Sequence, residues 1–166
     1  MLFVLTGPES SAKTTLAQDL SRHFNVPWIE EASRAYLQNR PGYGPTDLLQ
    51  IAELQMAAEL SVSAEFLFAD TDLQVVHIWW QEKFGPAPRW LSDAYKSQRR
   101  RHYLLCRPDL PWQPDPLREN PQDRERLFGL YRADLEARQL PFSEIAGQHE
   151  ERLQCAINAV EKLLDG

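Results

Sequence analysis

Short apolar runs alternate along the chain with longer segments in which apolar residues recur three and four positions apart. The short runs predict five strands, at residues 2–6, 25–29, 66–70, 102–106 and 141–145. The longer segments predict helices at 14–24, 46–64 and 151–164. This alternation is typical of βα units, so we expect one α/β domain over residues 1–166 with a five-stranded parallel sheet between two helical layers.

Two proline-rich stretches interrupt the alternation. RPGYGP at 40–45 contains two prolines and two glycines and predicts a loop between helices. RPDLPWQPDPLRENP at 107–121 contains five prolines, which lack the backbone N–H that regular structure requires. Because this stretch is long, polar and directly follows a predicted strand, we predict that it is a mobile lid that closes over bound ATP.

Composition and charge exclude several classes of protein. Hydrophobic residues make up 43% of the chain and charged residues 25%, as in soluble globular domains, and no apolar run could cross a bilayer. The net charge of −6 argues against nucleic-acid binding, since the basic run 99–101 predicts only a solvated segment. Without a signal-peptide pattern we expect a cytoplasmic protein with no membrane partner, and the oligomeric state stays open.

The two cysteines predict neither a zinc site nor a disulfide. Cys106 and Cys155 lie far apart, with no CxxC pattern and no histidine cluster nearby. We therefore expect both to be buried, reduced thiols.

The stretch GPESSAKTT at 7–15 has the spacing of a phosphate-binding loop between a strand and a helix. In that context the backbone N–H groups converge on an anion. Lys13 would reach the β- and γ-phosphates of ATP, and Thr14 would hold Mg²⁺ through its hydroxyl. The residues predicted to bind the nucleotide here are Gly7, Pro8, Glu9, Ser10, Ser11, Ala12, Lys13, Thr14 and Thr15.

Ala12 departs from the pattern, which has glycine at this position. A methyl group at a strained backbone position costs on the order of 1 kcal/mol, less than several charge-assisted phosphate contacts provide. We therefore expect weakened nucleotide binding at most. The alternative, a simple turn with a chance Lys-Thr pair, is disfavoured because the strand, the spacing and the helix agree.

Asp70 and Asp72 follow the third predicted strand, at the sheet edge where open α/β folds bind ligands. We predict that one of these catalytic carboxylates, most simply Asp70, serves Mg²⁺ and that the other accepts the proton of a substrate hydroxyl. The alternative for Asp72 is that it caps the next helix. The chain lacks an Asn-Lys-x-Asp stretch of the kind that reads guanine.

Arginines gather on the predicted lid and the helix after it. Mobile arginines stabilise the negative charge that develops during phosphoryl transfer. We predict catalytic roles for Arg118 and Arg124 and leave Arg107 and Arg126 open between such a role and simple solvation.

These segments together resemble the ribosylnicotinamide kinase domain of the bacterial NadR type, a group of phosphate-loop (P-loop) kinases and ATPases of NAD metabolism. The resemblance rests on segments in the same order along nearly the whole chain: GPESSAKTTL, the E-x-x-R of residues 31–34, FADTD, DPLREN, RERLF and PFSEIAGQHEERL. It implies a three-layer P-loop NTPase fold that uses ATP and Mg²⁺ to phosphorylate the 5′-hydroxyl of nicotinamide riboside, giving nicotinamide mononucleotide.

The same resemblance implies roles for individual residues. Glu31, Arg34 and Gln55 would contact the substrate or the transferred phosphate, and Gly147 would lie near the adenine. This chain has no fused adenylyltransferase domain in its 166 residues, and Met56 stands where relatives can place an aromatic residue. Other aromatic residues could stack a base or could belong to the core: Trp28, Tyr36, Trp79 and Trp80.

Two other functions share part of this pattern. A kinase for another small hydroxyl metabolite would use the same residues. A non-catalytic ATP-binding regulatory module would need neither paired carboxylates nor lid arginines around a second pocket.

Overall fold

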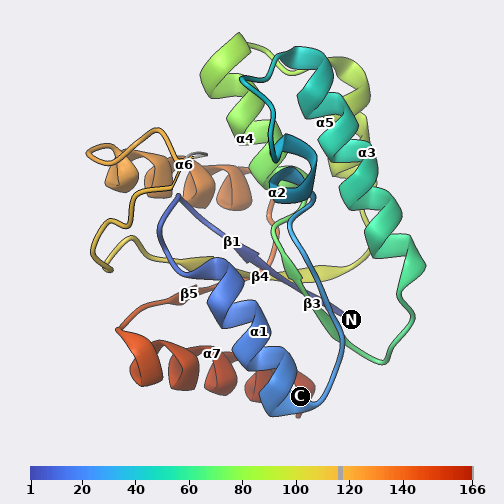
Figure 1. Cartoon of the computed structure of the whole chain (residues 1–166). Helices are drawn as coiled ribbons and strands as arrows, with labels where there is room; N and C mark the ends of the chain where they lie inside the picture. Colours follow the sequence, from blue (N-terminus) through green and yellow to red (C-terminus); the bar gives the residue numbers. More distant parts are fainter. Residues whose placement is uncertain (116–117, 166) are drawn as a thin grey trace.

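The computed structural model describes residues 1–115 and 118–165, and its centre is one parallel sheet of five strands in the order β2-β3-β1-β4-β5. The predicted α/β/α class is confirmed (Figure 1). The strands are β1 (Leu2–Thr6), β2 (Trp28–Ile29), β3 (Leu67–Asp70), β4 (Arg101–Cys106) and β5 (Phe142–Ile145). Only β1 has the predicted bounds, and β2 is much shorter than predicted because Pro27 precedes it.

The helices cover both faces of the sheet (Figure 1). They are α1 (Lys13–Phe24), α2 (Ala32–Leu37), α3 (Pro45–Ser61), α4 (Leu73–Phe84), α5 (Arg89–Lys96), α6 (Arg124–Ala137) and α7 (His149–Leu164). Phe3 and Leu5 of β1 point to the side of α1 and α7, whereas Leu2 and Val4 point to the side of α4 and α6. Alternate residues of one buried strand therefore build two separate cores.

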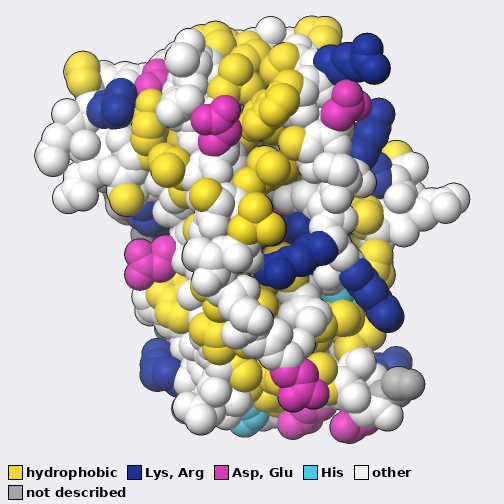
Figure 2. Space-filling view, turned by 90° about the vertical axis from the view of Figure 1, so that its right-hand side faces the viewer, with side chains coloured by type: hydrophobic (Ala, Val, Ile, Leu, Met, Phe, Trp, Pro, Cys, Tyr) yellow, Lys and Arg dark blue, Asp and Glu magenta, His cyan; other side chains and the backbone are white. Residues whose placement is uncertain are grey.

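A third apolar cluster joins α2, α3, α4 and α5 beside the sheet. Within it α5 was not predicted, although Leu91 and Tyr95 are buried at helical spacing four residues apart. Helix α3 begins at Pro45 as the loop prediction for 40–45 implies, with Gly44 donating its N–H to Asp47. The outer surface on this side carries many apolar side chains (Figure 2), and Leu60 of α3 is 80% exposed.

The carboxyl ends of the strands, at the left of Figure 1, meet the β1–α1 loop and the segment between β4 and α6. This segment forms no helix or strand in its described part, as its prolines predict, and residues 116 and 117 of the predicted lid lie outside the described residues. Among the residues described, no helix has the length and apolar character needed to cross a membrane. Cys106 is buried as predicted, but Cys155 is only half-buried.

Candidate active site

A cavity of about 1110 Å³ opens at the carboxyl edge of the sheet. The β1–α1 loop forms its floor, and its walls come from the start of α2, from α4, from the lid segment, from α6 and from the start of α7. The lining residues discussed below are residues 7–15, Glu31, Ser33, Arg34, Trp79, Lys83, Gln113, Asp115, Arg118, Glu119, Asn120, Tyr131, Gln148 and Arg152. The sheet therefore brings the predicted phosphate loop, the predicted lid and two of the three predicted substrate contacts, Glu31 and Arg34, to one space.

The floor of the cavity has the backbone of an anion-binding loop. A Cβ on Gly7, at φ 125°, would lie 2.6 Å from the carbonyl oxygen of Cys106, so only glycine fits where the loop leaves β1. The first backbone bond of α1 runs from the N–H of Leu16 to the carbonyl of Ala12 at 2.9 Å. The N–H groups of the turn before Leu16 are thus left for an anion at the positive end of the helix.

Ala12 adopts the left-handed conformation, with φ 60° and ψ 28°. Its methyl group makes this conformation about 1–2 kcal/mol less favourable than it is for glycine. The altered residue therefore keeps the backbone shape that glycine would adopt, at a cost in strain.

Thr14 and Asp70 meet at the inner end of the loop, where the Thr14 hydroxyl donates to Oδ2 of Asp70 at 2.5 Å. The Asp70 side chain is fully buried, and its Oδ1 has no hydrogen-bond partner among the described residues. Burial, followed by the nearby charge of Glu31, raises the pKa of Asp70 to about 6, while Thr14 and Lys13 oppose the shift. A buried carboxylate oxygen without a partner beside a hydroxyl suits a hydrated divalent cation.

Glu31 and Arg34 line the cavity as well. One Glu31 oxygen accepts from the Ser33 hydroxyl at 2.6 Å, and the other lies 3.6 Å from Nε of Arg34. Arg34 also pairs with Asp115 of the lid segment at 3.3 Å. An acidic and a basic side chain thus line the same cavity as the phosphate loop, and their contact with the substrate or the transferred phosphate stays a prediction.

The lid segment rests on the phosphate loop. The Glu9 carboxylate accepts from the backbone N–H groups of Glu119 and Asn120, at 3.0 Å each. The Ser10 hydroxyl accepts from the N–H of Gln113 at 2.9 Å. These contacts close the segment over the loop, and the predicted opening without ligand remains a prediction.

The predicted lid arginines occupy different places. Arg118 lines the cavity and donates to the carbonyl of Gln113 at 2.5 Å. Arg124 donates to the carbonyls of Ser10 at 3.3 Å and Leu110 at 2.9 Å, so it fastens the lid to the loop.

Arg107 and Arg126, which the sequence left open, do not line the cavity. Arg107 pairs with Glu144 and Arg126 with Glu82. The geometry therefore favours the solvated alternative for both arginines.

A family described as AAA domain matches residues 2–152. The chain belongs to this AAA-domain family. No curated protein sequence matches it.

Solved structures share the fold of this AAA-domain protein. NadR protein in complex with NR superimposes with a TM-score of 0.80 at 20% identity, over 97% of this chain and 50% of that chain. This chain therefore spans about half the length of NadR. YorR protein from Bacillus subtilis, in complex with phosphorylated GDP, superimposes with a TM-score of 0.59 at 19% identity, over 99% of this chain and 97% of that chain. Shikimate kinase from Acinetobacter baumannii, in complex with shikimate, superimposes with a TM-score of 0.56 at 14% identity, over 99% of this chain and 93% of that chain.

Neither Asp70 nor Asp72 of the AAA domain is among the residues that line the cavity, and the contacts of Asp72 are not those of the predicted catalytic carboxylate. Its Oδ1 accepts from the N–H of Gln74 at 2.9 Å and caps α4, which is the alternative that the sequence left open. Its Oδ2 accepts from Arg101 and from the Tyr103 hydroxyl at 2.8 Å each. Both carboxylate oxygens therefore accept hydrogen bonds from buried groups of the protein.

Gln55 is also absent from the cavity lining, although the resemblance made it a substrate contact. It is buried, with its amide oxygen accepting from the N–H of Ala32 at 3.0 Å and its amide nitrogen donating to the Thr71 carbonyl at 3.3 Å. It therefore fixes the backbone next to Glu31 instead of meeting a ligand.

Of the four aromatic residues proposed to stack a base, only Trp79 lines the cavity. Its indole N–H donates to the Tyr43 hydroxyl at 2.9 Å, and that hydroxyl lies 3.3 Å from the carboxylate of Glu119 on the lid. Lys83 forms an ion pair with the same carboxylate. Tyr131 of α6, which the sequence did not single out, also lines the cavity.

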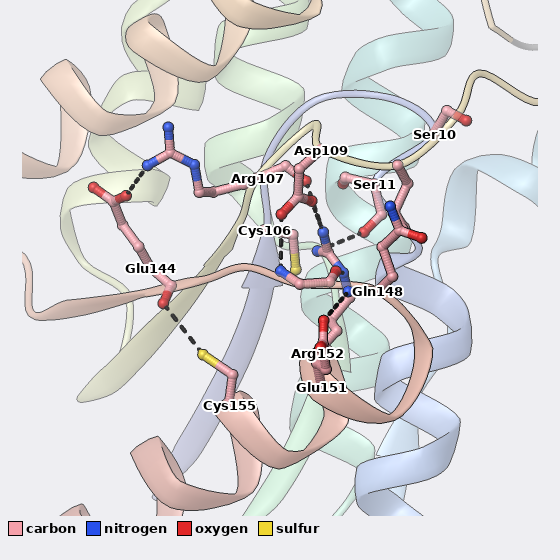
Figure 3. A network of polar contacts seen from close by, with 12 residues as sticks. Ser10, Ser11, Cys106, Arg107, Asp109, Glu144, Gln148, Glu151, Arg152 and Cys155 are labelled. Atoms are coloured by element: carbon pink, nitrogen blue, oxygen red, sulfur yellow. Dashed lines mark hydrogen bonds and ion pairs between the residues drawn. The ribbon is translucent and has the colours of Figure 1, made fainter.

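Arg152 is the principal residue of the site that sequence reasoning missed. Its side chain is buried and reaches from α7 to the phosphate loop, where it donates to the carbonyl of Ser11 at 3.2 Å (Figure 3). It forms an ion pair with Asp109, which also accepts from the N–H of Gly147 at 2.8 Å. Gly147 itself, at φ 96°, does not line the cavity but adjoins Gln148, which does, and its place near the adenine stays a prediction.

Replacing Ala12 with glycine is expected to remove the backbone strain without changing the loop. The unfolding temperature should rise by about 2 °C, and ATP should bind as tightly as before or up to a few-fold more tightly. Thermal unfolding and ATP titration of both forms measure this. A large loss of ATP affinity would show that the loop depends on alanine.

Proposed function

We propose that the protein is an ATP-dependent small-molecule kinase that phosphorylates the 5′-hydroxyl of a nucleoside, most specifically nicotinamide riboside. The observation that carries the proposal is the continuity of one cavity. It is lined both by the phosphate loop and by Glu31, Arg34 and Trp79. A module that only senses ATP needs no second pocket facing the phosphates.

The nucleotide would lie with its phosphates on the loop and its base near residues 148–153. Lys13, whose ammonium group now donates to the Pro8 carbonyl at 2.8 Å, would turn to the β- and γ-phosphates. Thr14 and Asp70 would hold Mg²⁺, directly or through water. When bound, that ion would neutralise phosphate charge and orient the γ-phosphate for transfer.

The acceptor would bind between Glu31 and the Trp79 wall. The substrate hydroxyl oxygen would bond to the γ-phosphorus while the bond from that phosphorus to the ADP oxygen breaks. The hydroxyl proton would pass to the Glu31 carboxylate. Arg34 and Arg118 would stabilise the charge on the moving group.

Three observations favour nicotinamide riboside as the acceptor. The motifs from the phosphate loop to PFSEIAGQHEERL resemble the ribosylnicotinamide kinase domain, and the NadR structure that superimposes on 97% of this chain was solved with NR. The cavity lining also includes two aromatic side chains, Trp79 and Tyr131, together with the carboxylate of Glu31. A flat cationic ring suits such a wall.

The kinases with this fold also include enzymes for other acceptors, among them the shikimate and thymidylate kinases. A coupled ADP-release assay over nucleosides, shikimate and related hydroxyl compounds decides among them. We expect the highest kcat/KM with nicotinamide riboside. A higher kcat/KM with another acceptor would support a kinase with that acceptor as its substrate. ATP binding without turnover on any acceptor would instead favour the regulatory module.

Arg118→Ala is expected to lower turnover by about 100-fold while weakening ATP binding by less than about threefold, because the guanidinium acts on charge that develops in the transition state. Arg124→Ala should lower turnover less, and the double variant should lose more than either single one. Steady-state kinetics on the best acceptor measure these effects. Arg126→Ala, an arginine outside the cavity, is the matched control, and equal kinetics for Arg118→Ala and this control would refute the role.

A further inference from the structure

Arg152 contacts the peptide group that joins Ser11 to Ala12. Its NH1 group donates to the Ser11 carbonyl, which is the oxygen end of that peptide, at 3.2 Å (Figure 3). The other end of the same peptide is the N–H of Ala12, the residue in the left-handed conformation. One buried side chain therefore holds the single peptide group whose orientation determines φ at Ala12.

The guanidinium of Arg152 is itself held rigidly. It donates to the Gly147 carbonyl at 3.0 Å and to the Arg107 carbonyl at 3.1 Å, and it pairs with Asp109. The residue is only 2% exposed. It thus fastens the phosphate loop to the first residues after β4 and to the β5–α7 turn.

We propose that Arg152, held by Asp109, is a positioning residue that maintains the anion-binding shape of the phosphate loop despite the alanine at position 12. An L-residue avoids φ near 60°, so an unrestrained loop would relax by rotating the Ser11–Ala12 peptide. That rotation would turn the Ala12 N–H away from the phosphates. The charge-assisted bond to the Ser11 carbonyl opposes the rotation.

This inference deepens the proposed function, since it assumes that the loop binds the phosphates of ATP. It makes a specific statement about two residues far apart in sequence. ATP binding should depend strongly on Arg152 while position 12 carries a methyl group. It should depend much less on Arg152 once that methyl group is removed.

The test is a double-mutant cycle between Arg152→Met and Ala12→Gly, with ATP affinity and the free energy of unfolding measured for all four proteins. Arg152→Met should weaken ATP binding by about 30-fold in the parent chain and by less than about threefold in the Ala12→Gly background, a coupling of about tenfold. The unfolding data should show coupling of the same sign.

Matched variants separate positioning from general stabilisation. Arg138→Met removes another paired arginine, bound to Asp134 at 2.8 Å and absent from the cavity lining, and should lower stability with no coupling to Ala12→Gly. Asp109→Asn keeps a hydrogen-bond acceptor for Arg152 but loses the negative charge. It should therefore couple to Ala12→Gly with the same sign and a smaller size. This variant replaces Arg152→Met in the cycle if Arg152→Met does not fold.

The outcomes are distinguishable. Additive effects of Arg152→Met and Ala12→Gly in both binding and unfolding would overturn the positioning role. Failure of the parent chain to bind ATP would overturn the proposed function instead, and the unfolding cycle would then still decide whether Arg152 holds the strained peptide.

Discussion

Lys13→Ala is expected to reduce phosphoryl transfer by about 100- to 1,000-fold while leaving the fold intact. The ammonium group is the only side-chain charge on the loop that can reach the transferring phosphate, and loss of one preorganised donor to developing charge costs about 100- to 1,000-fold in turnover. In the structure the group is only half-buried and makes one hydrogen bond, to the Pro8 carbonyl at 2.8 Å. Its removal should therefore change the unfolding temperature very little.

The experiment compares ADP release and thermal unfolding in Lys13→Ala and in Lys162→Ala. Lys162 is an exposed lysine near the end of α7, outside the cavity, so its variant should keep full activity. Full activity in purified, folded Lys13→Ala would contradict the assignment of the phosphate site. A large fall in unfolding temperature would instead show that the loop needs the charge to fold.

The phosphate loop was predictable from the sequence because its determinants are local. A buried strand, a glycine at the exit and an amphipathic helix follow one another within residues 2–24, and the backbone conformations they require are those observed. Even the departure at Ala12 could be evaluated, because the conformation that a glycine position demands is a property of that residue alone.

The roles of Asp72, Gln55 and Arg152 could not be predicted in the same way. Each is decided by partners far away in the sequence, such as Arg101 for Asp72 and Ser11 for Arg152. A carboxylate after a strand has the same local pattern whether it faces a ligand or a buried arginine. The sheet order and register decide between the two, and these appear only once the chain is folded.

Asp70→Asn is expected to lower turnover by about 100-fold or more and to shift the Mg²⁺ concentration needed for activity upward, because a neutral amide holds a hydrated cation poorly. Its effect on stability should have the opposite sign. Burial raises the pKa of Asp70 to about 6, so at neutral pH the ionised carboxylate opposes folding. Removing that charge should keep or raise the unfolding temperature, and the amide can still accept from Thr14.

Asp72→Asn should have the reverse effects, a clear loss of stability with little loss of turnover, although Asp72 lies only two positions from Asp70. Arg101 is only 4% exposed. The substitution leaves Glu59, at 3.2 Å, as its remaining acidic partner. Breaking one side of such a buried pair costs about 3 kcal/mol, or roughly 6–12 °C in unfolding temperature for a chain of this size. Turnover measured below the unfolding transition should fall by less than about threefold, since both Asp72 oxygens already bond within the protein, whereas Oδ1 of Asp70 has no partner among the described residues. Kinetics and thermal unfolding of the two variants, side by side over a range of Mg²⁺ concentrations, test the division. Similar losses of turnover in both would return Asp72 to the catalytic site, and unchanged turnover in Asp70→Asn would remove Asp70 from it.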